Sequence, residues 1–155
     1  MQCLVNCSSP ATPYAPAQLL LVSAVAPPDS AIPFTGSRLC NGFGSEWDSV
    51  LVVHAYTSPA DIRAFRIENY LAIHWLVVDQ EYNEGVCTLL FVKSNRYTAY
   101  SVFPRTIDWS AFADDKASKT ALAWLTPQDC ERLTAKGWVT SGHPKMNYTV
   151  RLSQP

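Results

Sequence analysis

"VCTLLFVKSNRYTAYSVF", residues 86–103, is the stretch of sequence that decides the fold. Its two halves, 86–93 and 96–103, are rich in Val, Leu, Phe, Tyr and Thr, and β-branched and aromatic residues favour strands. Only Ser94 and Asn95 stand between the halves, and a two-residue connection of small polar residues is typical of a β-hairpin. The sequence therefore predicts two antiparallel strands joined by a tight turn.

Further strands and a helix are predicted ahead of this hairpin. Residues 49–56, SVLVVHAY, have the composition of a strand. A helix begins after Ser58 and runs to about residue 68, because Ser at the cap and Pro59 at the first helical position are helix-start signals. Over residues 70–80, Ile, Trp and paired Val favour a strand over a helix. With the two strands of the hairpin, this strand predicts an antiparallel meander.

The C-terminal third of the chain brings helical patterns back. Residues 106–125 predict two short helices, and a last helix begins at the cap Thr126. Gly137 marks the end of that helix, because glycine accepts the left-handed conformation of a helix stop. Residues 147–153, NYTVRLS, form a closing strand. The fold class is α+β: one domain with an antiparallel sheet of about five or six strands and helices packed mainly on one face.

The chain of 155 residues fits a single domain. Prolines at positions 10, 13 and 16 predict an extended N-terminal arm over residues 1–16, followed by the α+β domain at 17–155. The apolar run at residues 17–28 resembles the end of a signal peptide, but no Lys or Arg precedes it, so a buried strand is the favoured interpretation. The run is too short to span a bilayer.

Charge and cysteine content limit the partners and the compartment that we expect for the protein. The formal net charge of −1 argues against a surface built wholly for phosphate backbones. The five cysteines match no metal or CxxC spacing, so we expect reduced thiols and a soluble, cytoplasmic protein. We expect no cofactor, no metal site and no membrane partner.

The hairpin also supplies the candidate binding surface. It combines cations and aromatic side chains, the residue types that anchor protein interfaces. The candidate contact residues are Phe91, Lys93, Arg96, Tyr100 and Arg105. With a two-residue turn, Lys93 faces Arg96 and Leu89 faces Tyr100, which places Phe91 and Tyr100 on one face. Cations beside aromatics also suit single-stranded nucleic acid, which stays open as an alternative partner.

The sequence holds no recognisable catalytic motif, so no catalytic residue is assigned. A small Cys/His-dependent enzyme stays open through Cys87, His54 and His74, although Cys87 stands in an apolar run that disfavours a thiolate. The favoured function is a non-enzymatic binding or accessory protein, of the adaptor, inhibitor or immunity type. Its partner would be another protein, including a second copy of itself in a homodimer, with nucleic acid less favoured.

Overall fold

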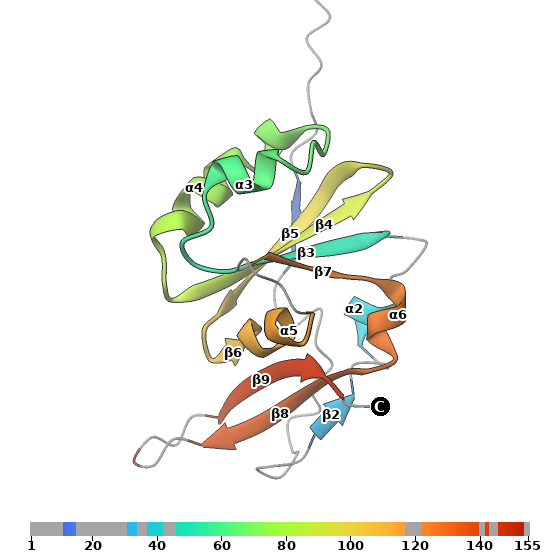
Figure 1. Ribbon diagram of the computed structural model, residues 1–155, viewed down its shortest axis with the longest axis vertical. Coiled ribbons are helices and arrows are strands. Elements are labelled where there is room, and N and C mark those ends of the chain that lie inside the picture. The colour runs from blue at the N-terminus through green and yellow to red at the C-terminus, as the bar shows by residue number, and fades with distance from the viewer. Residues whose placement is uncertain are drawn as a thin grey trace, which may run out of the picture.

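The computed structural model describes residues 11–14, 31–33, 37–41, 46–116, 122–139, 142 and 146–153. These residues form an α+β domain built on a five-stranded sheet with the order β1, β5, β4, β3, β7 (Figure 1). The strands are β1 (Thr12–Pro13), β3 (Ser49–Val53), β4 (Val86–Lys93), β5 (Arg96–Pro104) and β7 (Leu122–Leu125). The α+β class is thus as predicted, but the sheet is mixed, because β1 runs parallel to β5 while the other neighbours are antiparallel.

A second sheet of four strands has the order β2, β8, β9, β6 among the described residues. Its strands are β2 (Ala31–Pro33), β6 (Ile107–Asp108), β8 (Leu133–Val139) and β9 (Met146–Leu152). The helical elements are α2 (Arg38–Asn41), α3 (Pro59–Arg63), the 3-10 helix η1 (Tyr70–Ala72), α4 (His74–Tyr82), α5 (Ser110–Asp115) and α6 (Pro127–Cys130). The sequence predicts one sheet. The second was missed because most of β8 was assigned to a helix and β2 to a loop, so that β9 was predicted to close the single sheet.

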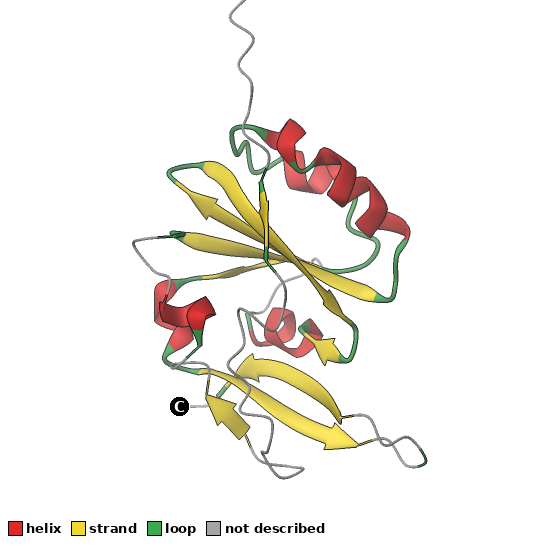
Figure 2. Ribbon diagram, turned by 180° about the vertical axis from the view of Figure 1, so that it is seen from behind, coloured by secondary structure: helices red, strands yellow, loops and turns green. Residues whose placement is uncertain are grey.

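The central strands of the five-stranded sheet are buried on both faces. Val50 and Val52 point into one hydrophobic cluster, and Leu51 and Val53 point into another. Figures 1 and 2 show α3 and α4 over one face, and α5 with the four-stranded sheet on the opposite side. This double burial explains why β3 and β4 read as continuous apolar runs instead of alternating ones.

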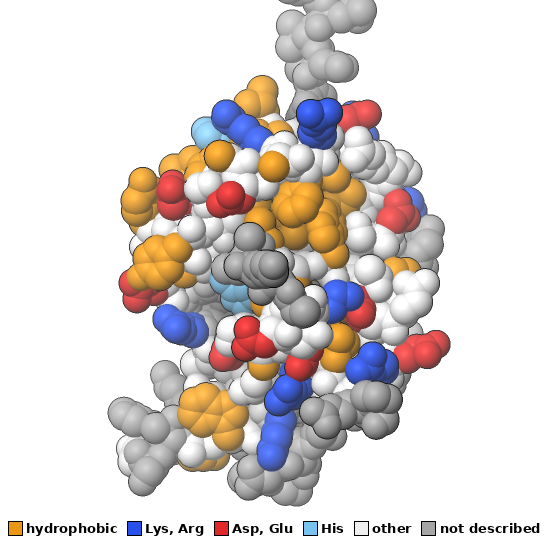
Figure 3. Space-filling model, in the orientation of Figure 1, with side chains coloured by type: hydrophobic (Ala, Val, Ile, Leu, Met, Phe, Trp, Pro, Cys, Tyr) orange, Lys and Arg blue, Asp and Glu red, His pale blue; other side chains and the backbone are white. Residues whose placement is uncertain are grey.

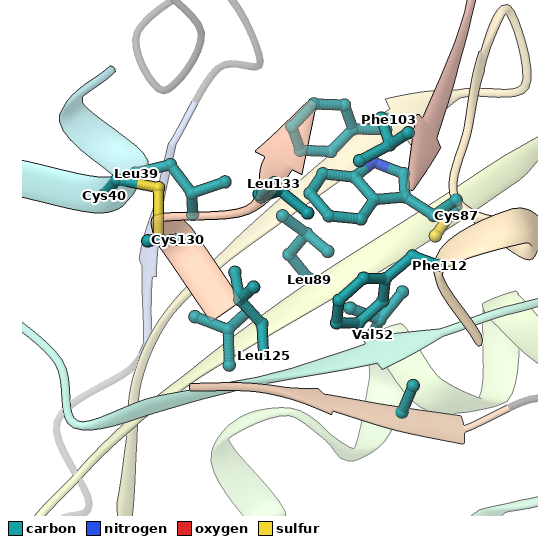
Figure 4. Packing of buried hydrophobic residues seen from close by; sticks show 14 of the residues in the cluster. Leu39, Cys40, Val52, Cys87, Leu89, Phe103, Phe112, Leu125, Cys130 and Leu133 are labelled. Carbon is teal, nitrogen blue, oxygen red and sulfur yellow. A yellow bond between two sulfur atoms is a disulfide. The ribbon is translucent and has the colours of Figure 1, made fainter. Parts of the chain in front are cut away.

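The larger core contains a disulfide between Cys40 of α2 and Cys130 of α6 (Figure 4). The two Cα atoms lie 5.6 Å apart, although the residues are 90 apart in the sequence. The expectation of reduced thiols is therefore wrong for this pair. Spacing along the chain could not reveal it, because the fold alone brings α2 beside α6. Cys87 is a free, buried cysteine, as expected.

The helix start at Ser58 is confirmed, and the strand at residues 70–80 is wrong. Ser58 and Asp61 form a capping box, and α3 is shorter than predicted, ending at Arg63. Residues 70–72 and 74–82 are helical, as η1 and α4. The side chains that α4 and its flank bury are Ile73, Leu76, Val77 and Gln80. This spacing of three and four residues is helical, and burial on the sheet outweighs the strand propensity of Ile and Val.

The last helix begins at the predicted cap but ends several residues before the predicted end. Thr126 and Asp129 form a capping box, but α6 stops at Cys130. Gly137 lies inside β8, paired with Tyr148, and is not a helix stop. From Leu133 onward buried and more exposed residues alternate along β8, which is the period of a strand.

Residues 106–125 form only one of the two predicted helices in their described part. Helix α5 occupies Ser110–Asp115, whereas Leu122–Leu125 is strand β7 and pairs with β3. The hairpin strands and the closing strand are confirmed, and the strand predicted at residues 49–56 is present but ends at Val53. Residues 17–28 and most of the predicted arm lie outside the described residues. None of the described helices has both the length and the apolar character needed to cross a bilayer.

Candidate protein-binding surface

The tip of the β4–β5 hairpin has the predicted turn. Ser94 and Asn95 adopt positive φ angles of 49° and 58°, as in the turn type that suits the twist of a two-residue hairpin. Lys93 pairs with Arg96, as predicted. Asp48 contributes to the turn by accepting a hydrogen bond of 2.7 Å from the backbone N–H of Ser94.

Beyond the tip, an irregularity changes the predicted register. The pairing shifts between Phe91 and Val92, so that Tyr100 faces Leu90 and not Leu89. A one-residue shift moves every following side chain to the other face of the sheet. Phe91 and Tyr100 therefore lie on opposite faces. The expectation that they share one face is wrong.

Phe91 belongs to the larger core. Its side chain is 1% exposed, and its ring meets those of Tyr14 and Trp47 edge-on, with centroids 5.5 and 5.9 Å apart. Tyr100 is half-buried beside the smaller core, and its ring meets that of Trp75 edge-on at 5.6 Å. Of these two aromatic candidates, only Tyr100 reaches the surface.

The three cationic candidates do not form one patch. Arg96 is exposed and pairs with Glu68, with Nη1 and Oε2 3.0 Å apart. Arg105 follows the far end of β5, where its Nη1 donates to the backbone carbonyl of Glu84 at 3.2 Å. Strand β5 spans roughly 30 Å at the usual rise per residue, so Arg105 is separated from Arg96 by its full length. Lys93 is half-buried at the end of β4.

A different surface adjoins Tyr100 through Trp75. Four apolar side chains of η1 and α4 point away from the core, and we call them the apolar stripe: Leu71, Trp75, Val78 and Tyr82. Their exposed fractions are 78%, 58%, 38% and 79% in that order. Within α4, the spacing i, i+3 and i+7 places Trp75, Val78 and Tyr82 along one side of the helix, and Leu71 precedes them on η1. Hydrophobic side chains reach the surface over α3 and α4 in Figure 3.

Polar side chains fix the helix that carries the apolar stripe to the sheet. The amide of Asn69 bonds both backbone groups of Tyr97: Oδ1 accepts from N–H and Nδ2 donates to the carbonyl, each at 2.9 Å. At the other end, buried Gln80 donates to the carbonyl of Val86 at 3.1 Å and accepts from the hydroxyl of Thr88. The surface is thus held rigidly at both ends, which lowers the entropy lost when a partner binds.

Charges of opposite sign flank the apolar stripe. Arg63 lies over the ring of Tyr70, 4.8 Å from its centroid, at the η1 end. Arg66 precedes η1, and Asp79 and Glu81 stand in the second half of α4. Within the described residues, none of the ion pairs involves Arg66, Asp79 or Glu81. The stripe therefore has a cationic end and an anionic end.

The Cys/His alternative finds its residues in an unfavourable environment. Burial raises the pKa of the Cys87 thiol far above its ordinary value, with a smaller contribution in the same direction from Asp108. Burial likewise lowers the pKa of His54, whose Nε2 is buried without a hydrogen-bond partner. His74 lies on α4, with Nδ1 3.1 Å from the hydroxyl of Tyr70. A thiolate is the reactive form of cysteine, and this site disfavours it.

Within the described residues, no group of three or more His, Cys, Asp or Glu side chains is placed so that it could hold a metal ion.

The apolar stripe was missed because residues 70–80 were predicted to be a strand. The signal that could have found it is the pair of interleaved helical patterns in this segment. One contains Ile73, Leu76 and Val77, and the other contains Trp75 and Val78. Neither pattern has the period of two that a strand requires.

Comparison with known proteins adds no further assignment: no family model, no characterised protein and no solved structure matches the chain.

Proposed function

We propose that the chain is a non-enzymatic binding or accessory protein, of the adaptor, inhibitor or immunity type, that acts through a protein–protein surface. The observation that carries the proposal is the apolar stripe on η1 and α4. Leu71, Trp75 and Tyr82 are each more than half exposed. Trp and Tyr are the side chains that contribute most to protein interfaces when they become buried. Tyr100 extends the surface onto β5 through its contact with Trp75.

The size of this exposed surface supports a protein partner. Scaled by ordinary side-chain areas, the exposed fractions of the apolar stripe correspond to roughly 500 Å², the upper range for the surface of a monomer. The flanking charges supply the polar rim that interfaces have around an apolar centre. Rigid attachment through Asn69 and Gln80 means that little order has to be gained on binding.

The two alternatives, a small Cys/His-dependent enzyme and a binder of single-stranded nucleic acid, have less support. A cysteine nucleophile needs a thiolate, and burial opposes ionisation of Cys87. Single-stranded nucleic acid needs cations along a path with exposed aromatic rings. Here Arg96 is paired with Glu68, and Phe91 is buried in the core.

The cytoplasmic location predicted from the sequence rested on reduced thiols, and Cys40 and Cys130 are not reduced in the structure. The disulfide between Cys40 and Cys130 favours an oxidising compartment instead, because cytosolic thiol systems keep most protein cysteines reduced. We therefore propose that the binding surface works where disulfides persist. Rapid denaturation of whole cells in the presence of an alkylating reagent, followed by thiol counting, tests this: two unreacted sulfurs at positions 40 and 130 support it, and reaction of both refutes it.

The binding function is tested with a paired measurement. The double variant Trp75→Ser/Tyr82→Ser removes both aromatic side chains of the apolar stripe. Tyr82 is exposed, but Trp75 has an edge contact with Tyr100, so we expect a loss of about 0.5–1.5 kcal/mol in stability. The melting temperature should fall by no more than about 6 °C, and protein association, measured by affinity capture from the native host, should be lost. Trp138→Ser is the control, because Trp138 is also exposed, at 42%, but lies on β8. Equal capture by the wild type and the double variant would contradict the proposal.

A further inference from the structure

The charges around the apolar stripe are arranged so that the surface is complementary to itself. Arg63 and Arg66 lie at its N-terminal end, and Asp79 and Glu81 lie near its C-terminal end. If two such helices pack antiparallel about a twofold axis, the cationic end of each meets the anionic end of the other. A lipid surface offers no such match, because the acidic end would face anionic or neutral head groups.

The same rotation also matches the apolar side chains. The middle of the stripe lies between Trp75 and Val78, so a twofold axis there places Leu71 of one copy beside Tyr82 of the other. Trp75 then packs against Val78 of the second copy, a large side chain against a small one. Each contact occurs twice, as in every isologous interface.

We propose that the partner bound by the apolar stripe is a second copy of this chain, in an antiparallel twofold dimer; this inference rests on the proposed function. The stripe alone would bury roughly 1,000 Å² over the two copies, which is about the minimum for a specific interface, and the charged rim would add to it. With this axis Glu81 of each copy lies opposite Ala72 of the other, close to Tyr70, whose ring Arg63 covers. The contact that defines the register is therefore Arg63 of each copy with Glu81 of the other.

The decisive experiment mixes two charge-reversed variants of the full chain. In Arg63→Glu, residue 63 faces Glu81 of the second copy with like charge, and in Glu81→Arg the like charges are positive. Each variant alone should therefore dimerise at least about tenfold more weakly than the wild type at low salt. An equimolar mixture should recover the dimer, because in the mixed dimer both contacts again join opposite charges. Sedimentation velocity over a concentration series measures all four samples.

Two further variants separate the apolar contact from general effects of mutation. Trp75→Asp should weaken the dimer at least about 30-fold, as expected for a central aromatic residue of an interface. Val139→Asp is the matched control and should leave the dimer unchanged, because Val139 is 46% exposed on β8, away from the stripe. A dimer unaffected by Trp75→Asp would overturn the inference. So would a mixture of the charge variants that associates no better than either variant alone.

A photo-crosslinking amino acid at position 78 distinguishes failure of this inference from failure of the proposed function. Crosslinking to a second copy in the purified protein supports the dimer. If the wild type stays monomeric up to about 200 µM, its self-association is weaker than that of a specific interface of this size, and the dimer is overturned. If position 78 then crosslinks to a different protein in host extract, the binding function stands without the dimer. If it crosslinks to no protein, both proposals fall.

Discussion

Removal of the Cys40–Cys130 disulfide should lower the free energy of unfolding substantially. The bond joins residues that are 90 apart in the sequence, and the loop-closure model assigns about 4–5 kcal/mol to a closed loop of that length. Measured values are usually smaller, about 2–4 kcal/mol, because unfolded chains retain some structure. For a domain of this size each kcal/mol lowers the melting temperature by roughly 2–4 °C, so we expect a decrease of about 10 °C.

The assay compares urea unfolding of the wild type with that of the double variant Cys40→Ala/Cys130→Ala, each with and without reductant. Reductant should destabilise only the wild type. Cys87→Ala serves as the control, because Cys87 is equally buried but unbonded. Thiol titration gives the sharpest test: after unfolding without reductant, no more than three of the five cysteines should react, since two are bonded. Five reactive thiols would refute the disulfide and the stability difference derived from it.

Three further outcomes are expected. Phe91→Ala should lower stability by about 3–5 kcal/mol in chemical unfolding, whereas Arg96→Ala should change it by less than about 1 kcal/mol, because one side chain is in the core and the other forms an exposed ion pair. Ser58→Ala should lower stability by about 1 kcal/mol through loss of the capping box, and Ser58→Asp should largely preserve it. Burial lowers the pKa of His54, so the unfolded chain binds a proton at this residue before the folded chain does as the pH falls. The contribution of neutral His54 to stability is therefore complete above about pH 6.5 and is lost below it. The variant His54→Gln should weaken the pH dependence of the urea midpoint.

The elements that the sequence predicted correctly are those whose local signals agree with their burial. The turn at Ser94 and Asn95 and the cap at Ser58 each place a residue where its own backbone chemistry is favourable. No distant contact is needed to specify them. The second sheet lacked such signals, because β8 contains Gly137 and follows a capped helical turn, which together resemble a complete helix.

The candidate site was only partly accessible to sequence reasoning, because it depends on register. A single irregularity between Phe91 and Val92 moves Tyr100 to the face opposite Phe91. An inserted residue in one strand of a pair has no reliable signature in composition or spacing. Tyr100 was identified as a surface residue, but its neighbour Trp75 comes from a helix 25 residues earlier in the chain. Contacts of that kind follow from packing and cannot be read from either segment alone.

Helix α4 explains both the wrong strand and the missed surface. Its segment is apolar on two sides, so neither a helical nor a strand period dominates its sequence. One side, with Leu76 and Val77, is fixed by the sheet, and its burial stabilises the fold. The other side, with Trp75 and Tyr82, contributes little to the fold beyond the edge contact of Trp75 with Tyr100, and it exposes apolar area to water. A helix that needs only its inner side to fold can lose its outer aromatic rings without unfolding. Variants of Trp75 and Tyr82 therefore separate association from stability, which variants of Leu76 cannot do.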